Sequence, residues 1–254
     1  MEVEGAKVLV TGASSGIGAS LAPMLAEAGA TVGIVARRED RLTDVLVACQ
    51  EHSPDCRMWV RDLGDPDDAA ALAIEVWDTF GCVDVLVNNA AIPKRRMVQV
   101  LTPDEVDETM RVNFASPVRM TLALLPRMLE RDAGVIVNVS SLGGRLGILQ
   151  EAAYCASKFA LCGWSESLAA DLWHTGVDVR LVNPGPIDTE IWDQPGNDPA
   201  HYEGPFEPPS VVAAAIISAI EGTAFETYTP DLKSVVEWKT ANIDDFIGGV
   251  ASQS

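Results

Sequence analysis

The chain has 254 residues, with 18 lysines and arginines against 37 aspartates and glutamates, and its formal net charge is −19. A chain this acidic repels phosphate backbones and anionic membrane surfaces, so we expect neither a nucleic-acid nor a membrane partner. Apolar residues make up 48% of the chain and charged residues 22%, which excludes a disordered or fibrous protein. The length fits a single α/β domain over residues 1–254, and no apolar run approaches the roughly 20 residues of a membrane span.

The five cysteines and three histidines are scattered along the chain. No two cysteines form a C-x-x-C pair, so we expect reduced thiols, no disulfide framework and no metal site. The chain start has no basic segment before its first apolar stretch, which argues against a secretory leader. These features predict a cytoplasmic protein.

Short runs rich in β-branched residues alternate with longer helical segments. Each run is apolar through its middle, as parallel strands covered on both faces are. This succession predicts a Rossmann-like, doubly wound parallel sheet of about seven strands, with helices on both faces. The first six predicted strands are Lys7–Thr11, Thr31–Ala36, Arg57–Arg61, Val83–Val87, Val135–Val139 and Val177–Val182.

Helix start and stop signals lie between these runs. Asp65–Pro66 predicts a helix start, and Thr102–Glu105 has the pattern of a capping box. Gly29 and Gly176 stand where glycines that end helices are common. Pro23 falls inside the first predicted helix, where it should produce a kink.

The composition changes after the sixth predicted strand. Residues 184–209 contain seven of the 15 prolines, so this stretch predicts an irregular loop. A loop of that length in a compact domain is usually a lid or a binding loop, and we assign residues 186–209 to that role, with Gly196 and Gly204 as hinges. The elements expected after it are a helix from a Ser210 cap to about Ile220, a strand over Phe225–Thr229 and a weaker helix from Asp231.

The first predicted strand runs directly into a glycine turn, Gly12–Gly18. Such a turn before a helix lets backbone N–H groups approach a pyrophosphate at the positive helix terminus. Its spacing, G-x-x-x-G-x-G, differs from the usual G-x-G-x-x-G dinucleotide pattern. Taken alone, the turn indicates either a dinucleotide site or only close packing of strand and helix.

Four further motifs follow this turn in chain order. Asn88–Ala91 comes first, then Ser141, then the Y-x-x-x-K pair Tyr154 and Lys158, then Pro184–Gly185. Together the five motifs resemble those of the short-chain dehydrogenase/reductase family, over about residues 5–190. The sequence departs from that family in having N-N-A-A for N-N-A-G, and in lacking the glycine-rich V-D-G-G ending of many fatty-acid-type relatives.

Tyr154 and Lys158 stand four residues apart on a predicted helix, so their side chains lie on one face. The Lys158 ammonium, with the positive charge of an oxidised nicotinamide, should favour the Tyr154 phenolate and lower its pKa from about 10. Tyr154 would then be general acid in reduction and general base in oxidation, while Ser141 would hydrogen-bond the substrate oxygen. The resemblance implies that Lys158 also binds the nicotinamide ribose and that Asn113 holds a proton-carrying water.

Two arginines, Arg37 and Arg38, end the second predicted strand where an acidic residue would mark NAD(H). Guanidinium groups clamp a 2′-phosphate by charge-assisted hydrogen bonds, so we predict NADP(H) rather than NAD(H). The alternative is a solvated strand end paired with the acidic residues that follow it. The resemblance implies that Asp62 bonds the adenine and Thr189 the nicotinamide carboxamide. The predicted cofactor-binding residues are Gly12, Ser14, Ser15, Gly16, Ile17, Gly18, Arg37, Arg38, Asp62, Leu63, Asn89, Ala90, Tyr154, Lys158, Pro184, Gly185, Ile187 and Thr189.

These residues predict an oxidoreductase that interconverts a secondary alcohol and a ketone or other carbonyl compound. Apolar residues after Ser141 and in the loop favour a lipophilic small-molecule substrate, although ordinary packing explains them equally well. Two alternatives stay open: a catalytically silent NADP(H) sensor or scaffold, and a 3-oxoacyl thioester reductase. A sugar-nucleotide epimerase or dehydratase fits less well, because the glycine spacing differs and the substrate region is short.

Two surface features bear on binding partners. Lys94–Arg96 would either meet an anionic substrate group, such as a coenzyme A phosphate, or form a solvated cluster. The predicted helix Ala152–Thr175 carries apolar residues such as Phe159 and Trp164 on more than one face. Because relatives pair through this helix and the helix that carries Asn113, we expect a homodimer or a homotetramer.

Overall fold

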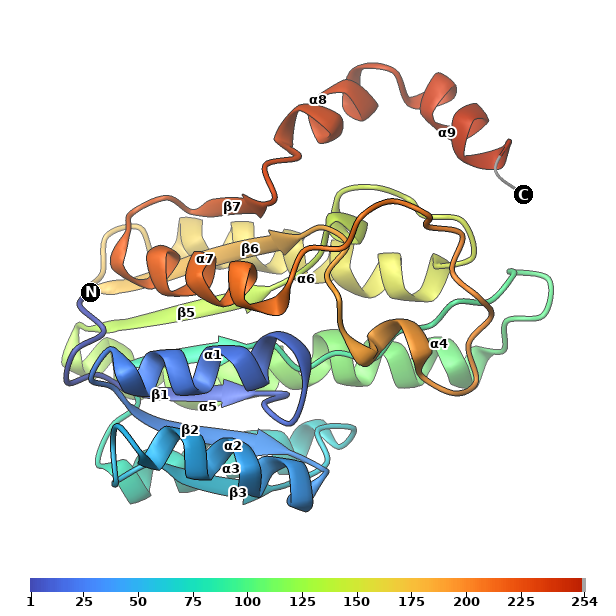
Figure 1. The fold of residues 1–254 in the computed structure, drawn as a ribbon. Coiled ribbons are helices and arrows are strands. Elements are labelled where there is room, and N and C mark those ends of the chain that lie inside the picture. Colours follow the sequence, from blue (N-terminus) through green and yellow to red (C-terminus); the bar gives the residue numbers. More distant parts are fainter. Residues whose placement is uncertain (253–254) are drawn as a thin grey trace.

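A seven-stranded parallel sheet forms the centre of the computed structural model, which describes residues 1–252 (Figure 1). Its strand order is β3-β2-β1-β4-β5-β6-β7, so the chain builds outward in one direction from β1 and then in the other from β4. The strands are β1 (Lys7–Thr11), β2 (Thr31–Ala36), β3 (Arg57–Val60), β4 (Val85–Asn88), β5 (Gly134–Val139), β6 (Val177–Pro184) and β7 (Glu226–Thr229).

Helices cover both faces of this sheet. Helices α1, α2 and α7 contribute to one apolar core, and α3, α5 and α6 to the other. Figure 1 shows α1 and α7 in front of the sheet. The predicted Rossmann-like, doubly wound fold of a single domain is therefore confirmed. The helices of residues 1–252 are α1 (Gly16–Glu27), α2 (Glu39–Gln50), α3 (Pro66–Phe80), α4 (Pro103–Met110), α5 (Ser116–Arg131), α6 (Ala152–Asp171), α7 (Pro209–Glu221), α8 (Lys233–Ala241) and α9 (Ile243–Ala251).

The apolar strands follow from this two-sided covering. In β1, Val8 and Val10 enter the core beneath α1, while Leu9 between them enters the opposite core. All three side chains are fully buried. Because neighbouring residues of a strand point to opposite faces, a strand covered on both sides needs apolar residues at every position.

The predicted helix starts at α3 and α4 are confirmed. The Asp65 carboxylate accepts hydrogen bonds from Asp67 N at 3.0 Å and Asp68 N at 3.3 Å, and α4 begins with the capping box Thr102–Glu105. Helix α1 runs from Gly16 to Glu27 as one helix that includes Pro23. Local capping chemistry thus fixes the residues at which α3 and α4 begin.

Three predictions about the second half of the chain are wrong. Helix α6 ends at Asp171, so Gly176 does not end it. A glycine is needed at position 176 for another reason, because a Cβ there would lie 1.8 Å from the carbonyl oxygen of Asp132. Helix α7 begins at Pro209, so Ser210 lies in its first turn and makes no capping bond. The tail forms two helices, α8 and α9, rather than one.

Helices α8 and α9 extend away from the sheet beyond β7 (Figure 1). Neither contains a buried residue, and Trp238 and Ile247 are among their exposed apolar side chains. Within residues 1–252, none of the helices combines the length and the apolar character that a membrane crossing requires.

Candidate active site

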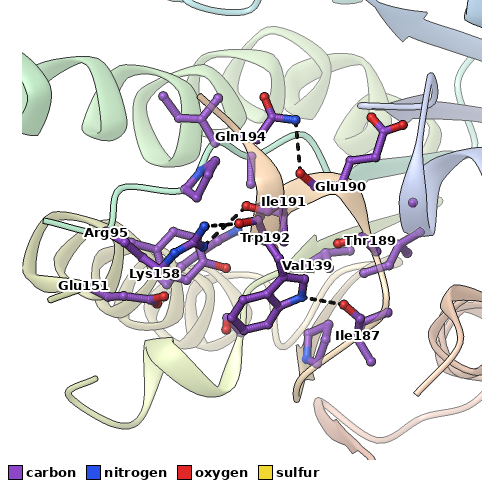
Figure 2. Close-up of a pocket in the computed structure, with 18 of the residues that line it drawn as sticks. Arg95, Val139, Glu151, Lys158, Ile187, Thr189, Glu190, Ile191, Trp192 and Gln194 are labelled. Carbon is purple, nitrogen blue, oxygen red and sulfur yellow. Dashed lines mark hydrogen bonds between the residues drawn. The ribbon is translucent and has the colours of Figure 1, made fainter. Parts of the chain in front are cut away.

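A cavity of about 1010 Å³ opens at the carboxyl ends of the strands. Its walls come from the segments that follow β1 to β6, from the loop 186–209 and from Phe246 and Val250 of α9. Figure 2 shows part of this lining, including Lys158, Thr189 and Trp192. Ligands of doubly wound sheets bind at this edge, where the strand order reverses between β1 and β4.

Most of the predicted site residues line this one cavity. Two do not: Gly18 lies in the packing behind the glycine turn, and Asn113 is buried beside the cavity wall. Those that do are Gly12, Ser14, Ser15, Gly16, Ile17, Arg37, Arg38, Asp62, Leu63, Asn89, Ala90, Ser141, Tyr154, Lys158, Pro184, Gly185, Ile187 and Thr189.

The glycine turn approaches its neighbours too closely for side chains. Gly12 and Gly16 have φ values of 68° and 54°, in the left-handed region that favours glycine. A Cβ on Gly12 would lie 2.7 Å from Ala90 Cα, and one on Gly18 would lie 2.4 Å from Gly12 O. The turn therefore serves close packing and also leaves bare backbone against the cavity, where a pyrophosphate fits.

The Arg38 side chain lies at one end of the cavity, beside this turn, and is held there by hydrogen bonds. Its guanidinium donates to Ser15 Oγ at 2.6 Å, to Ser14 Oγ at 3.2 Å and to Glu190 Oε2 at 2.8 Å. Arg41 also binds the Glu190 carboxylate, and the two arginines hold the pKa of Glu190 below its usual value. The Glu190 carboxylate of the loop therefore occupies one of the Arg38 N–H donors that a cofactor phosphate would use.

Arg37 lies in a different environment. Its side chain is 60% exposed, and its Nη1 is 3.9 Å from Asp62 Oδ1. The same oxygen of Asp62 accepts a hydrogen bond from Gly64 N at 2.9 Å, so this carboxylate also shapes the turn after β3. Arg37 is free to reorient toward a ligand, whereas Arg38 is already held.

Tyr154, Lys158 and Ser141 come together at the floor of the cavity. Lys158 is almost fully buried, and its Nζ donates to Val139 O at 2.9 Å and lies 5.8 Å from the centre of the Tyr154 ring. Ser141 follows β5, and its Oγ accepts a hydrogen bond from Gly143 N at 3.0 Å. Parallel strand β5 and helix α6 thus bring the predicted acid–base pair and the predicted oxygen-binding hydroxyl to one place.

Burial controls the ionisation of this pair in the protein alone. It raises the pKa of Tyr154 above its usual value, although hydrogen bonding with Ser141 acts in the lowering direction. Burial also lowers the pKa of Lys158 to about 8. The expected lowering of the Tyr154 pKa is therefore absent here, and the charge of a bound oxidised nicotinamide remains the source that would supply it.

Asn113 holds the loop after β4 against α6. It lies in a short π-helical turn, Arg111–Ala115, between α4 and α5. Its Oδ1 accepts from Ile92 N at 2.8 Å, and its Nδ2 donates to Ile92 O at 2.9 Å and to Ser157 Oγ at 3.1 Å. These bonds position the chain next to the cavity, and the role of Asn113 in proton transfer stays a prediction.

The basic run Lys94–Arg96 is neither a solvated cluster nor a free anion site. Lys94 Nζ and Arg96 Nε each lie 3.3 Å from Glu105 Oε1. Arg95 is 3% exposed, and its guanidinium donates to the carbonyl oxygens of Ile191, Trp192 and Asp198. The run therefore holds the loop 186–209 in place, a function that sequence reasoning missed.

Sequence reasoning also missed three polar residues that line the cavity, Gln150, Glu151 and Glu190. Glu151 stands three residues before Tyr154, so the one available signal was helical spacing from a predicted catalytic residue. The aromatic residues of the loop did suggest a binding role. Trp192 packs against the Phe206 ring at 5.1 Å and the Tyr202 ring at 6.3 Å between ring centres.

One cavity thus brings together the glycine turn and the Ser141, Tyr154 and Lys158 side chains. A family model described as short chain dehydrogenase matches residues 6–199. The chain belongs to the short-chain dehydrogenase/reductase family.

Several curated relatives share about a third of their residues with the chain. YxnA of Bacillus subtilis (strain 168), named an uncharacterized oxidoreductase, is 36% identical over 229 residues, which cover 87% of this chain and 64% of YxnA. Mouse dehydrogenase/reductase SDR family member 7B is 36% identical over 73% of this chain and 59% of its own length. D-threitol dehydrogenase of Mycolicibacterium smegmatis is 33% identical over 85% of both chains. The chain thus spans about three fifths of the length of the first two relatives.

Solved structures share the whole fold. A short-chain dehydrogenase from Sphingobium yanoikuyae in complex with NADPH superposes with a TM-score of 0.83 at 27% identity, over 97% of this chain and 95% of that one. A short-chain dehydrogenase/reductase from Burkholderia phymatum in complex with NAD has a TM-score of 0.87 at 23% identity, over 96% of each chain, and shares the fold. Structural neighbours therefore bind either cofactor.

Proposed function

We propose that the protein is an NADP(H)-dependent oxidoreductase that interconverts a secondary alcohol and a ketone, with an apolar small molecule as substrate. The observation that carries the proposal is the meeting of Ser141, Tyr154 and Lys158 in one cavity with the glycine turn and Arg38. The relative named D-threitol dehydrogenase supports chemistry at an alcohol carbon. The apolar side chains of Leu149, Ile191 and Trp192 at the same cavity support a hydrocarbon body.

Bound NADPH would supply a hydride to the carbonyl carbon, and NADP⁺ would accept one from the alcohol. The Tyr154 hydroxyl would give its proton to the carbonyl oxygen in reduction and take it back in oxidation. The Ser141 hydroxyl would hydrogen-bond the same oxygen and stabilise its developing charge. Lys158 would keep its positive charge beside Tyr154 and bind the cofactor ribose, while Ser14, Ser15 and the bare glycine backbone would hold the phosphates.

Mixing the protein with NADPH and a panel of ketones, and following NADPH absorbance, tests this function. Oxidation of NADPH by at least one ketone supports it. Tight NADPH binding without turnover of any ketone or 3-oxoacyl thioester would contradict it and favour a sensor.

Cofactor preference is expected to depend on Arg38 and Glu190. NADPH should bind more tightly than NADH, and Arg38→Ala should weaken NADPH binding by roughly 10- to 100-fold, because it removes charge-assisted hydrogen bonds to the 2′-phosphate. Glu190→Gln should tighten NADPH binding about threefold or more, because the 2′-phosphate then displaces an amide instead of a carboxylate from Arg38. Fluorescence titration measures both effects.

Arg57, an exposed arginine outside the cavity, provides the control, and Arg57→Ala should leave NADPH affinity unchanged. Equal affinities of the parent protein for NADPH and NADH would contradict the NADP(H) preference. Tighter NADH binding in Glu190→Gln would instead indicate a general charge effect.

We expect one part of the loop 186–209 to stay fixed by hydrogen bonds and another part to open and close over the cavity. Asp188 N donates to Glu207 O and Asp198 N to Arg95 O, both at 2.9 Å, so residues 187–198 should exchange their amide hydrogens slowly. Tyr202 and Glu203 lie in an exposed stretch, residues 199–206, and there we expect fast exchange that slows when NADPH and an unreactive substrate analogue are both bound. Identical exchange in both states, measured by mass spectrometry, would mean that no lid closes.

A homodimer or homotetramer is also proposed. Phe159 of α6 is 41% exposed and Trp173 just after this helix is 78% exposed, while Leu122 and Leu129 of α5 also face solvent. Exposed apolar side chains on helices α5 and α6, which contribute to the same core, are typical of a subunit interface.

A further inference from the structure

Gln150 and Glu151 occupy an unusual stretch of chain immediately before α6. Gln150 has a φ of 64°, a left-handed conformation that few residues with a side chain adopt. Glu151 stands at the N-cap position of α6, yet its carboxylate makes no capping hydrogen bond. Both residues line the cavity that contains Tyr154. Backbone strain of this kind often accompanies a functional site.

Both side chains bring hydrogen-bond acceptors without partners. Gln150 Oε1 is buried and accepts no hydrogen bond. Glu151 is 7% exposed, and no donor among residues 1–252 hydrogen-bonds its carboxylate. A buried acceptor such as Gln150 Oε1 costs free energy unless a donor reaches it. The Glu151 carboxylate, which lines the cavity, therefore calls for a ligand with hydrogen-bond donors.

Arg95 is the charged neighbour of Glu151, and it makes no hydrogen bond to the Glu151 carboxylate. Its guanidinium is committed to three carbonyl oxygens of the loop and lies over the Trp192 ring, with 5.5 Å to the ring centre. Figure 2 shows the carboxylate end of Glu151 directed into the cavity, on the same side as Arg95. Burial raises the pKa of Glu151 to about 7, while the charge of Arg95 acts in the lowering direction. Because Arg95 partly offsets the charge of Glu151, a neutral donor suits this place better than a cation.

The spacing between Glu151 and Tyr154 fixes where that donor would be. The two residues are three positions apart at the start of α6, so their side chains lie on one face of the helix. A substrate oxygen at the Tyr154 hydroxyl thus leaves the neighbouring substrate atoms close to Glu151. Apolar side chains, among them Ile148, Leu149 and Trp192, also line this cavity.

We propose that Gln150 and Glu151 bind a second hydroxyl group of the substrate, next to the reacting carbon. The substrate is then an α-hydroxyketone, or the corresponding vicinal diol, on an apolar body. This assignment rests on the proposed ketone reductase function, and it names the substrate class of the same cavity.

The test compares α-hydroxyacetophenone with α-methoxyacetophenone, which has the same skeleton but no hydroxyl donor. With NADPH, the wild-type protein should reduce the hydroxyketone with a kcat/KM at least about tenfold higher. Glu151→Leu should bring the ratio to within about twofold of one, by raising KM for the hydroxyketone. Gln150→Leu should reduce the ratio by a smaller factor. NADPH affinity of each variant, measured first, verifies its fold.

Glu27 supplies the control, because it is an exposed carboxylate outside the cavity. Glu27→Leu should leave the ratio between the two ketones at its wild-type value. A wild-type ratio near one, or an equal loss of the ratio in Glu27→Leu, would overturn the assignment.

A binding measurement separates this inference from the proposed function. Calorimetry on the protein loaded with NADP⁺ should give a Kd for phenylethanediol at least about tenfold lower than for its terminal methyl ether, and Glu151→Leu should remove the difference. Equal Kd values would overturn the inference even where no ketone is reduced. Tighter binding of phenylethanolamine than of the diol would overturn it in favour of an ammonium site. Failure to reduce any ketone, with the diol preference intact, would overturn the ketone reductase function alone.

Discussion

Tyr154→Phe is expected to lower kcat about a thousandfold or more, with NADPH affinity within about twofold of the parent protein. The substitution removes only the hydroxyl, so the shape of the cavity is kept. Without that hydroxyl, the substrate oxygen loses the proton donor that we propose for it. Single-turnover kinetics, with NADPH and a ketone that the parent protein reduces, measures the change in the chemical step.

Tyr202 gives a matched control for this experiment. It also lines the cavity, but its hydroxyl donates to Pro205 O at 2.9 Å within the loop. Tyr202→Phe should therefore change kcat by no more than a few-fold. If Tyr154→Phe kept more than a tenth of the parent kcat, Tyr154 would not be the proton donor.

Lys158→Met should abolish most turnover and yet stabilise the cofactor-free protein at neutral pH. Burial lowers the pKa of Lys158 to about 8, so the buried ammonium costs roughly 3 kcal/mol of unfolding free energy below that pH. Met removes this cost, but it leaves Val139 O without its hydrogen bond, and that loss lowers the free energy of unfolding by about 1–2 kcal/mol. We expect a net gain of about 1–2 kcal/mol, measured by urea unfolding at pH 7.

The pH dependence identifies the cause of that gain. Below about pH 8 the lysine is charged in both the folded and the unfolded chain, so its full burial cost is present. Between about pH 8 and the ordinary lysine pKa of about 10.4, the folded state has released its proton and the unfolded state has not, so the cost declines as pH rises. The advantage of Lys158→Met should therefore shrink over this range. Lys233→Met, at an exposed lysine, should show no such trend.

The parts of the fold that were predictable from sequence depend on local chemistry. Because their side chains enter two cores in alternation, the strands β1, β2 and β5 are mostly apolar, and this pattern can be recognised in the sequence alone. Capping at Asp65 and Thr102 likewise involves only neighbours in sequence. The role of Gly176 was predicted wrongly because it depends on a residue far away in sequence. The carbonyl of Asp132, 44 residues earlier, leaves no room for a Cβ at position 176.

The candidate site divides in the same way. The family resemblance singled out Ser141, Tyr154 and Lys158, and strand ends and helical spacing explain why they line one cavity. Arg95 looked like a solvent-exposed charge, because its partners are carbonyl oxygens about 100 residues later in the chain, and carbonyl groups leave no mark in a sequence. Glu190 was missed for a related reason, since its arginine partners lie about 150 residues earlier.

The contacts between Arg95 and the loop limit how this protein can be redesigned. The buried Arg95 guanidinium donates to three carbonyl oxygens of the loop, and the backbone N–H of Arg95 donates to Asn197 Oδ1 at 2.7 Å. A substrate loop transplanted from another protein without its own partner segment would leave this guanidinium buried and unbonded. Residues 92–96 and 187–198 consequently behave as one exchangeable unit, and a graft that alters specificity has to carry both.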